Sequence, residues 1–521
     1  MKNFICYAAF AALVPAFGQT TTPQVSAVAA ARLLDQAAWG PTPAAIQQVQ
    51  QMGISGWINA QFALNTSDLP DQSILDSAGM SNNDLRPVQR AFFANAVTGQ
   101  DQLRQRVAFA LSQMWVVSAT SGVPQAYAYP PYWRIFRDNA FGNYRDIIHA
   151  VTLNPAMGKY LSMANNNKAN PVAGTAANEN YGRELLQLFT LGLTQLNTDG
   201  TPVVDSNGIP VPTYTEAMVP NMAKVVTGWT YPVAPGATAK VNNPAYYFGQ
   251  MYAVESEHDT TAKAIFGGIT IPSGQSAAAD LNSLLDALMQ QTTMAPFVCQ
   301  QLIEHLVTSN PSAAYIQRVS NVFLNNGSGV RGDMQAVIMA ILTDPEARAG
   351  DTPTGVVSRN FGHLREPVLF LANLLRGLNA TLTSTSAIYN DASLLSEDLF
   401  YEPSVFSYFS PLSRTEKGLF GPEFQIYSTQ TAASRGDIIN SAIFDGALDS
   451  GTKVDLTPFV QQASNIGSLI DYISYVFLHG SISSNLTQAA TDAASAAATP
   501  LAKVQAALYL VLTSAEYQVI Q

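Results

Sequence analysis

The sequence predicts a mainly α-helical fold: one large multi-helix globular domain with long loops and a small β-hairpin excursion near residues 197–213. Three observations favour this fold class. Signals for the start and the end of helices recur along the chain, whereas strand signals are few. In addition, 47% of the 521 residues are hydrophobic and only 12% are charged, compared with ~25% charged residues in an average soluble domain. A chain of this composition can bury a large core.

The clearest helix signal lies at residues 42–53. Thr42 can cap the helix, Pro43 fits its first turn and Gly53 fits its C-terminal end. Similar signals predict seven further helices, over residues 101–117, 178–192, 214–227, 277–291, 294–308, 313–325 and 333–342.

Two glycine turns, at residues 197–200 and 205–208, predict the β-hairpin excursion because short β-prone segments flank them. Asp199, Asp205 and Asn207 also suggest a calcium loop, but the EF-hand spacing is absent and no glutamate closes the loop. Turn chemistry is therefore the favoured interpretation, and calcium binding near Asp199 is the alternative.

An internal similarity links residues 336–346 with residues 506–516, because both apolar segments end in Leu-Thr-x-x-Glu. In each copy the Thr and the Glu fit a capping box, in which both side chains satisfy free N–H groups at a helix start. The similarity indicates either two related helical subdomains meeting around residues 350–380 or a chance likeness of two apolar helices. We divide the mature chain into an N-terminal helical region, 19–350, and a C-terminal helical region, 351–521, packed on the first.

The first residues predict a signal peptide over residues 1–18. Lys2 precedes a short apolar stretch, which ends in the small-x-small step Ala16-Phe17-Gly18. We expect cleavage near Gly18, a mature chain that begins near Gln19, and a secreted or periplasmic location.

Charge and cysteine content exclude several classes of protein. The formal net charge of −11, with no basic run, argues against a nucleic-acid binder. Cys6 falls in the predicted signal peptide, so Cys299 is the only cysteine of the mature chain and no internal disulfide is expected. Cys299 lies among apolar neighbours and is interpreted as an inert buried thiol. No histidine pair has the helical spacing of a zinc protease. We therefore predict no metal, no cofactor and no membrane span in the mature chain.

Short sequence blocks occur in a characteristic order. They are Arg32-Leu33-Leu34 with Ala38-Trp39-Gly40-Pro41-Thr42, Leu103-Arg104-Gln105-Arg106-Val107-Ala108, Asn178-Glu179-Asn180-Tyr181-Gly182-Arg183-Glu184-Leu185, Thr227-Gly228-Trp229, His258-Asp259, Ala295-Pro296-Phe297, Arg365-Glu366-Pro367-Val368 and Ser404-Val405-Phe406. Together they resemble the domain-of-unknown-function 1800 family of exported bacterial proteins, from about residue 29 to residue 518. Gly182 stands where that family usually has alanine, and Gln187 where it often has glutamate. The resemblance implies no established activity. It does imply an exported sulfatase-like partner, because genes of this family are often found beside those of such proteins.

A helical wheel of residues 178–192 places Glu184 between Leu188 and Leu191, on the apolar side. A buried carboxylate needs a cationic or hydrogen-bonding partner. We expect Arg104 or Arg365 to pair with Glu184.

Two interpretations of these charged residues remain open. In the first they form one polar pocket. Its candidate catalytic residues are Glu184, Glu366, His258 and Asp259, and its candidate ligand-binding residues are Arg104, Arg365, Asn178 and Asn180. Glu184 or Glu366 would act as general acid or base, and the arginines would hold an anionic or polyhydroxylated ligand. In the second, which is favoured, the charges are buried structural pairs that fix helix register, and His258-Asp259 is part of a turn.

Two classes of function follow from these interpretations. An exported surface binding or assembly protein, working with another exported protein, predicts paired buried charges without an open cleft. A secreted hydrolase or lyase acting on an extracellular polysaccharide or similar polymer predicts the same charges around a cleft. The aromatic run at residues 127–133 is interpreted as packing, with a carbohydrate-stacking platform as the alternative. The first class is preferred because no catalytic signature is present.

Overall fold

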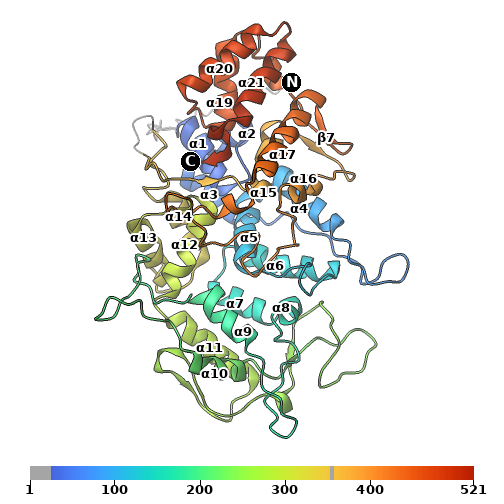
Figure 1. Ribbon diagram of the computed structural model, residues 1–521, viewed down its shortest axis with the longest axis vertical. Coiled ribbons are helices and arrows are strands. Elements are labelled where there is room, and N and C mark those ends of the chain that lie inside the picture. Colours follow the sequence, from blue (N-terminus) through green and yellow to red (C-terminus); the bar gives the residue numbers. More distant parts are fainter. Residues whose placement is uncertain (1–24, 353–356) are drawn as a thin grey trace, which may run out of the picture.

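The computed structural model describes residues 25–352 and 357–521. The predicted signal peptide and its cleavage step lie outside the described residues. The described chain is mainly helical, as predicted, with a few short strands in small sheets. Figure 1 shows an elongated arrangement, with α19–α21 at one end, α9–α11 and long loops at the other, and α5, α12 and α15 between them.

The elements have the following bounds. The α-helices are α1 (Ala27–Ala37), α2 (Pro43–Met52), α3 (Ile54–Phe62), α4 (Arg86–Thr98), α5 (Gln102–Met114), α6 (Tyr129–Asn139), α7 (Tyr144–Thr152), α8 (Pro155–Tyr160), α9 (Asn180–Glu184), α10 (Val219–Val225), α11 (Ala277–Gln290), α12 (Met294–Leu306), α13 (Ala313–Leu324), α14 (Met334–Thr343), α15 (Pro367–Gly377), α16 (Tyr389–Leu394), α17 (Thr429–Asn440), α18 (Thr457–Val460), α19 (Ile466–Phe477), α20 (Ser484–Ala496), α21 (Pro500–Thr513) and α22 (Ala515–Gln518). The tighter 3₁₀ turns are η1 (Ala126–Ala128), η3 (Glu216–Met218), η4 (Glu255–Glu257), η5 (Phe266–Gly268) and η6 (Pro422–Ile426), and the wider π turns are η2 (Leu185–Thr190) and η7 (Ser441–Asp445). The strands are β1 (Trp229–Thr230), β2 (Tyr252–Ala253), β3 (Lys263–Ala264), β4 (Thr270–Ile271), β5 (His363–Leu364), β6 (Thr381–Leu382), β7 (Ala447–Asp449), β8 (Thr452–Lys453) and β9 (Val519–Ile520). They pair antiparallel as β1–β2, β3–β4, β5–β9 and β6–β8–β7.

Local capping signals place the helix ends correctly. Helix α2 begins after Thr42, whose hydroxyl accepts a hydrogen bond from the N–H of Ala45 at 3.2 Å, and it ends at Gly53 with a φ of 76°. The predicted helices between residues 277 and 343 are confirmed as α11, α12, α13 and α14. The predicted helix at 214–227 is shorter, because its first turn is the 3₁₀ turn η3 and α10 ends at Val225.

The internal similarity corresponds to two helical hairpins, α13–α14 and α20–α21. Glu346 accepts hydrogen bonds from the N–H of Ser312, at 3.0 Å, and from its hydroxyl; Ser312 is the N-cap of α13. Glu516 makes the same two contacts with Ser483, the N-cap of α20. The predicted capping boxes are wrong, because the threonine of each copy bonds back to a carbonyl oxygen of its own helix. Instead, the glutamate that follows the second helix of each hairpin binds the N-cap serine of the first helix.

The predicted β excursion is a small meander over residues 193–213. The N–H of Gln195 donates to the carbonyl of Val211, and the carbonyl of Gln195 accepts from the N–H of Val203, both at 2.8 Å. Pairing stays limited to isolated bridges, because proline occupies one position of each bridge and lacks an N–H donor.

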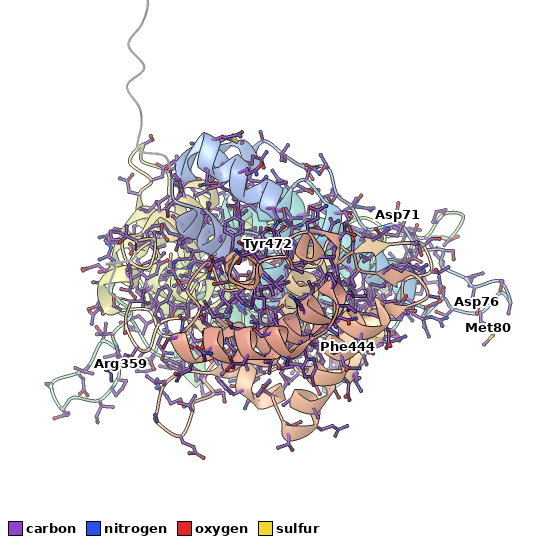
Figure 2. All side chains as sticks on the ribbon, turned by 90° about the horizontal axis from the view of Figure 1, so that it is seen from above. Asp71, Asp76, Met80, Arg359, Phe444 and Tyr472 are labelled. Atoms are coloured by element: carbon purple, nitrogen blue, oxygen red, sulfur yellow. The ribbon has the colours of Figure 1, made fainter. Side chains whose placement is uncertain are left out.

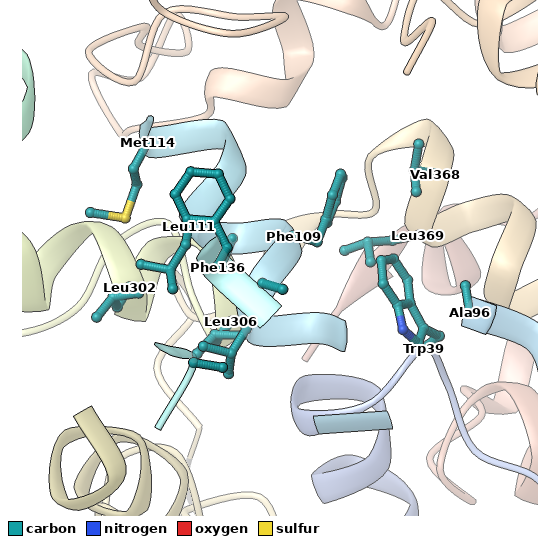
Figure 3. Close-up of a cluster of buried hydrophobic side chains, with 14 of the residues drawn as sticks. Trp39, Ala96, Phe109, Leu111, Met114, Phe136, Leu302, Leu306, Val368 and Leu369 are labelled. Atoms are coloured by element: carbon teal, nitrogen blue, oxygen red, sulfur yellow. The ribbon is translucent and has the colours of Figure 1, made fainter. Parts of the chain in front are cut away.

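One continuous hydrophobic core runs through the described residues. Figure 3 shows part of it, with Trp39 near Phe109 of α5 and Leu369 of α15, and with Leu302 and Leu306 of α12 in another part of the same cluster. Trp39 and Phe109 have ring centroids 5.3 Å apart. Residues from both sides of position 350 share this core, and the division into regions 19–350 and 351–521 stays a prediction.

Several loops extend away from this core. Figure 2 shows Asp76 and Met80 at the tip of one of them, where Met80 is exposed. Among the helices of the described chain, none is long and apolar enough to cross a membrane.

Candidate functional site

The residues of the predicted pocket lie in separate places. Arg104 donates to three backbone carbonyl oxygens, those of Phe62 at 3.0 Å, Leu64 at 2.5 Å and Arg137 at 2.9 Å. Its guanidinium also lies 4.6 Å from the ring centroid of Phe141. Arg104 therefore caps carbonyl groups at the C-terminal ends of helices α3 and α6. The prediction that it pairs with Glu184 is wrong.

Arg365 pairs with Asp35 instead of Glu184, through two hydrogen bonds of 2.7 and 2.9 Å. Asn373 donates to Asp35 at 2.9 Å, and Nε2 of His479 lies 3.0 Å from its other oxygen. Tyr517 donates to Asn373 at 3.0 Å. We call these five buried residues the Asp35 cluster. Burial alone raises the pKa of Asp35, but Arg365 and His479 together hold that pKa far below its usual range.

His258 is buried between three segments. Its Nε2 lies 3.0 Å from an Asp280 oxygen on α11, and its Nδ1 lies 3.0 Å from the carbonyl oxygen of Thr227. Lys263 reaches the same Asp280 oxygen at 2.5 Å. Asp259 accepts hydrogen bonds from the residue two places on, as in an Asx turn. This geometry is that of a turn held in place by a buried ion pair.

Glu184 is half-buried and makes no hydrogen bond or ion pair with the residues that the structure describes. The predicted position of Glu184 between two leucines is wrong, because α9 ends at Glu184 and continues as the π turn η2. A π turn has more residues per turn than the ~3.6 of an α-helix. Leu188 and Leu191 are therefore rotated away from the positions that the wheel gives them.

The two predicted ligand-binding asparagines are exposed and shape the start of α9. The side-chain oxygen of Asn178 accepts a hydrogen bond from the N–H of Asn180 at 2.9 Å. The backbone of Asn178 is held in turn by the side chain of Asn166, through bonds of 2.7 and 3.0 Å.

Glu366, by contrast, lies in a buried group of mixed charge. Gln113 of α5 donates to Glu366 at 3.1 Å. Glu397 accepts a hydrogen bond from the N–H of Val368 at 2.7 Å, and the neighbouring carboxyl group of Glu366 contributes to the raised pKa of Glu397. Nδ1 of His363 lies 3.4 Å from Oε1 of Glu423. We define the carboxyl cluster as Arg106, Gln113, His363, Glu366, Glu397 and Glu423.

Many polar atoms of the carboxyl cluster have no hydrogen-bond partner among the described residues. Burial raises the pKa of Glu366, and burial together with Glu366 raises the pKa of Glu397 well above its usual range. Burial therefore disfavours the ionised form of both carboxyls. Five of the six members have side-chain atoms without a hydrogen-bond partner among the described residues: Nε and Nη1 of Arg106, Oε1 of Gln113, Nε2 of His363, Oε1 of Glu397 and Oε2 of Glu423. Buried polar groups are normally satisfied, so a concentration of exceptions is typical of a functional site.

A cavity of about 440 Å³ adjoins this cluster. Its lining comes from α5, η2 and the residues that follow η2, α12, and the segment 405–423. The mouth is marked by exposed apolar residues, namely Leu193 (58% exposed), Phe406 (41%) and Leu412 (71%). The buried end includes Gln113 and Glu423, which belong to the carboxyl cluster as well.

Three titratable side chains line the cavity: Glu304, His305 and Glu423. Burial, with a contribution from Glu423, raises the pKa of Glu304 to about 8. Burial, with a contribution from the nearby Arg106, lowers the pKa of His305 to about 3. At neutral pH, Glu304 therefore carries a proton and His305 is uncharged.

Sequence reasoning missed Glu304, Glu423 and Gln113. A signal for Glu304 is present, because the polar run Gln300-Gln301 and the pair Glu304-His305 occupy one face of the otherwise apolar helix α12. Gln187, which stands where the family often has glutamate, also lines the cavity and accepts a hydrogen bond from Tyr214 at 3.1 Å.

Burial and turn geometry decide the roles of Cys299, the aromatic run and Asp199. Cys299 is fully buried, and burial raises the pKa of its thiol, as expected for an inert residue. The aromatic side chains of residues 127–133 are buried, so they pack in the core and form no exposed platform. Asp199 accepts hydrogen bonds from the N–H and the hydroxyl of Thr201 and serves the turn. No group of His, Cys, Asp and Glu side chains suited to a metal ion occurs in the described part of the chain.

Comparison with known protein families matches residues 32–519 to the family described as "Protein of unknown function (DUF1800)". The chain belongs to this family. No curated protein and no solved structure gives a match to the chain. The DUF1800 blocks at residues 295–297 and 404–406 contribute Phe297, Val405 and Phe406 to the cavity lining, and the block at 365–368 contributes Glu366 to the adjoining carboxyl cluster.

Proposed function

We propose that this chain is an exported binding protein that holds an apolar segment of another exported protein in the cavity beside α12. The cavity carries the proposal, because it combines exposed apolar residues at its mouth with unpartnered polar atoms at its buried end. Sites that bind specific ligands typically have mostly apolar walls and a few polar groups that fix orientation.

The volume of the cavity limits the size of the ligand that it can hold. About 440 Å³ accommodates one or two side chains, and a whole folded domain is far too large. A protruding peptide segment of a partner protein fits this requirement. The family resemblance suggests a sulfatase-like exported protein as that partner, and export itself rests on the signal at residues 1–18.

Peptide display on the purified mature protein tests this function. We expect random peptides selected on the parent protein to share an apolar motif. Leu412→Glu places a charge at the mouth, and we expect it to weaken the selected peptides about tenfold or more, because an apolar contact is replaced by a charge that must be desolvated.

Val172→Glu is the matched control, because Val172 is an exposed apolar residue that is not part of the cavity lining. Its affinity for the selected peptides should equal that of the parent. Selection that yields no peptide, or peptides that bind both variants equally, would reject the proposed function.

A hydrolase or lyase acting on an extracellular polymer is the second candidate. Glu304 and Glu423 line one cavity, and Glu304 is protonated at neutral pH, as a general acid requires. Release of reducing sugar from a panel of extracellular polysaccharides, lost in Glu304→Gln, would favour this candidate over binding alone.

A further inference from the structure

We propose that the buried end of the cavity binds a cationic group, the ammonium of a lysine or the guanidinium of an arginine on the partner segment. This inference rests on the proposed function and specifies which residue of the partner enters the cavity. Glu304, Glu423 and Gln113 would accept its hydrogen bonds.

Charge complementarity is the first argument. The described residues that line the cavity include two carboxyl groups, Glu304 and Glu423, and neither lysine nor arginine. The third titratable residue, His305, is uncharged at neutral pH. Above pH 8, where Glu304 has lost its proton, a cationic guest is therefore favoured over an anion, which would meet like charge.

Unpartnered acceptors are the second argument. Oε2 of Glu423 and Oε1 of Gln113 have no hydrogen-bond partner among the described residues, although Glu423 is 6% exposed and Gln113 is 7% exposed. Both side chains line the cavity. An ammonium offers three donors and no acceptor, and a guanidinium offers five, so either group matches a site built from acceptors.

The aromatic lining is the third argument. Phe297, Phe406, Phe409 and Phe420 all line the cavity, and the face of a phenylalanine ring attracts a cation. One of these rings already has a cation above it, because the guanidinium of Arg414 lies 3.8 Å from the ring centroid of Phe420. The stem of a lysine or arginine would contact the same rings.

Binding of a cation would expel a proton. Gln300 on the same helix donates a hydrogen bond to Glu304 at 2.8 Å, and Glu423 on η6 contributes to its raised pKa. The next residue, His305, is in turn influenced by His363 on β5 and Arg106 on α5. Its pKa of about 8 means that a cation must displace the Glu304 proton below pH 8. Affinity should therefore increase with pH up to about 8 and level off above it.

Three probes of equal length separate charge from apolar contact: n-hexylammonium, 1-hexanol and hexanoate. Isothermal titration of each into the intact mature protein at pH 8.5 should show hexylammonium binding about tenfold or more tightly than hexanol, because hydrogen bonds to charged groups are stronger than neutral ones. Hexanoate should bind most weakly. Below pH 8, hexylammonium binding should release a proton, which titration in buffers of different ionisation enthalpy detects.

Glu304→Gln and Glu423→Gln should each reduce the preference for hexylammonium over hexanol, and Glu304→Gln should also abolish proton release. Glu416→Gln is the matched control, since Glu416 is an exposed glutamate of the same 405–423 segment but is not part of the lining. Thermal melting checks that each variant is folded.

The cation site is overturned if hexylammonium binds no more tightly than hexanol, including the case in which neither binds. It is also overturned if Glu304→Gln and Glu423→Gln both keep the preference of the parent. Failure of the proposed function looks different, because hexylammonium would then bind as expected while peptide display yields no apolar segment. A display that yields apolar peptides without lysine or arginine supports the proposed function and rejects the cation site.

Discussion

Two buried groups of charged residues, the Asp35 cluster and the carboxyl cluster, differ in how completely their charges are paired. In the first, Arg365, Asn373 and His479 all contact Asp35, and no buried side-chain atom of the five members is left without a partner among the described residues. In the second, three carboxyl groups face one arginine, and several donors and acceptors have no partner in the described part of the chain. The same chemical groups thus serve a structural role when fully paired and indicate a binding role when they are not.

The position of each group in the fold agrees with this difference. The Asp35 cluster joins α1 to α15 and to residues near the C-terminal end of the chain, far apart in sequence. The carboxyl cluster reaches the wall of the cavity through Gln113 and Glu423. Substitutions should therefore affect mainly stability in the Asp35 cluster and mainly ligand binding or pH dependence near the carboxyl cluster.

The largest effect is expected for Asp35→Ala. Removing this carboxylate leaves the buried Arg365 without its counter-ion and His479 without its partner, and such a change typically costs about 3–5 kcal/mol. Urea unfolding of the mature protein measures the loss. Asp35→Asn keeps the shape and part of the hydrogen bonding and should be less severe. A loss below about 1 kcal/mol for Asp35→Ala would show that the cluster is not a structural anchor.

A dependence of stability on pH is the next largest effect. Burial raises the pKa of Glu402 to about 8 in the folded chain, whereas an unfolded glutamate titrates near its ordinary value. Between these two pKa values the folded state binds more protons than the unfolded state, so stability falls as pH rises and has fallen fully above about pH 8. From pH 6.5 to 8 this amounts to about 2 kcal/mol for one group.

Above pH 6.5, the change of stability with pH reports on the carboxyl groups and not on His305. The lowered pKa of His305 has the opposite effect, because the unfolded histidine takes up a proton as pH falls, but only below about 6.5. Glu402→Gln keeps an oxygen for the hydroxyl of Tyr408 and should flatten the decline. A decline that is unchanged in Glu402→Gln would mean that this group does not titrate in the window.

The carboxyl cluster should tolerate a substitution that the Asp35 cluster does not. In Glu397→Gln the amide oxygen can still accept from the N–H of Val368, and the amide N–H₂ can donate to Glu366. Because this removes a buried carboxyl whose ionisation is disfavoured by burial and by Glu366, we expect a gain of about 1 kcal/mol at pH 8, measured by urea unfolding. A loss comparable to that of Asp35→Ala would show that the two clusters have the same role.

The sequence could predict what depends on neighbours along the chain, and this includes the fold class and most helix ends. Thr42 and Gly53 predict both ends of α2 because capping is local. The site depends on contacts between distant segments, which a single sequence does not show. The sequence singles out Arg365 as a candidate partner of Glu184, but its partner Asp35 lies 330 positions away. The sequence also singles out Glu366, but its neighbours Gln113, Glu397 and Glu423 come from three other segments.

The smallest effect is expected for Glu184→Ala. Helical periodicity predicts a buried, arginine-paired carboxylate here, and loss of such a pair would cost about 3–5 kcal/mol. The π turn η2 changes the periodicity directly after Glu184, and Arg104 and Arg365 have other partners. Glu184 is half-buried and has no cationic partner among the described residues, so its removal leaves no buried cation unpaired. We therefore expect a change in stability of no more than about 0.5 kcal/mol. Thermal melting at pH 7 decides between the two values. A loss of several kcal/mol would mean that Glu184 has a buried cationic partner and that the contrast between paired and unpaired clusters must include α9 as well.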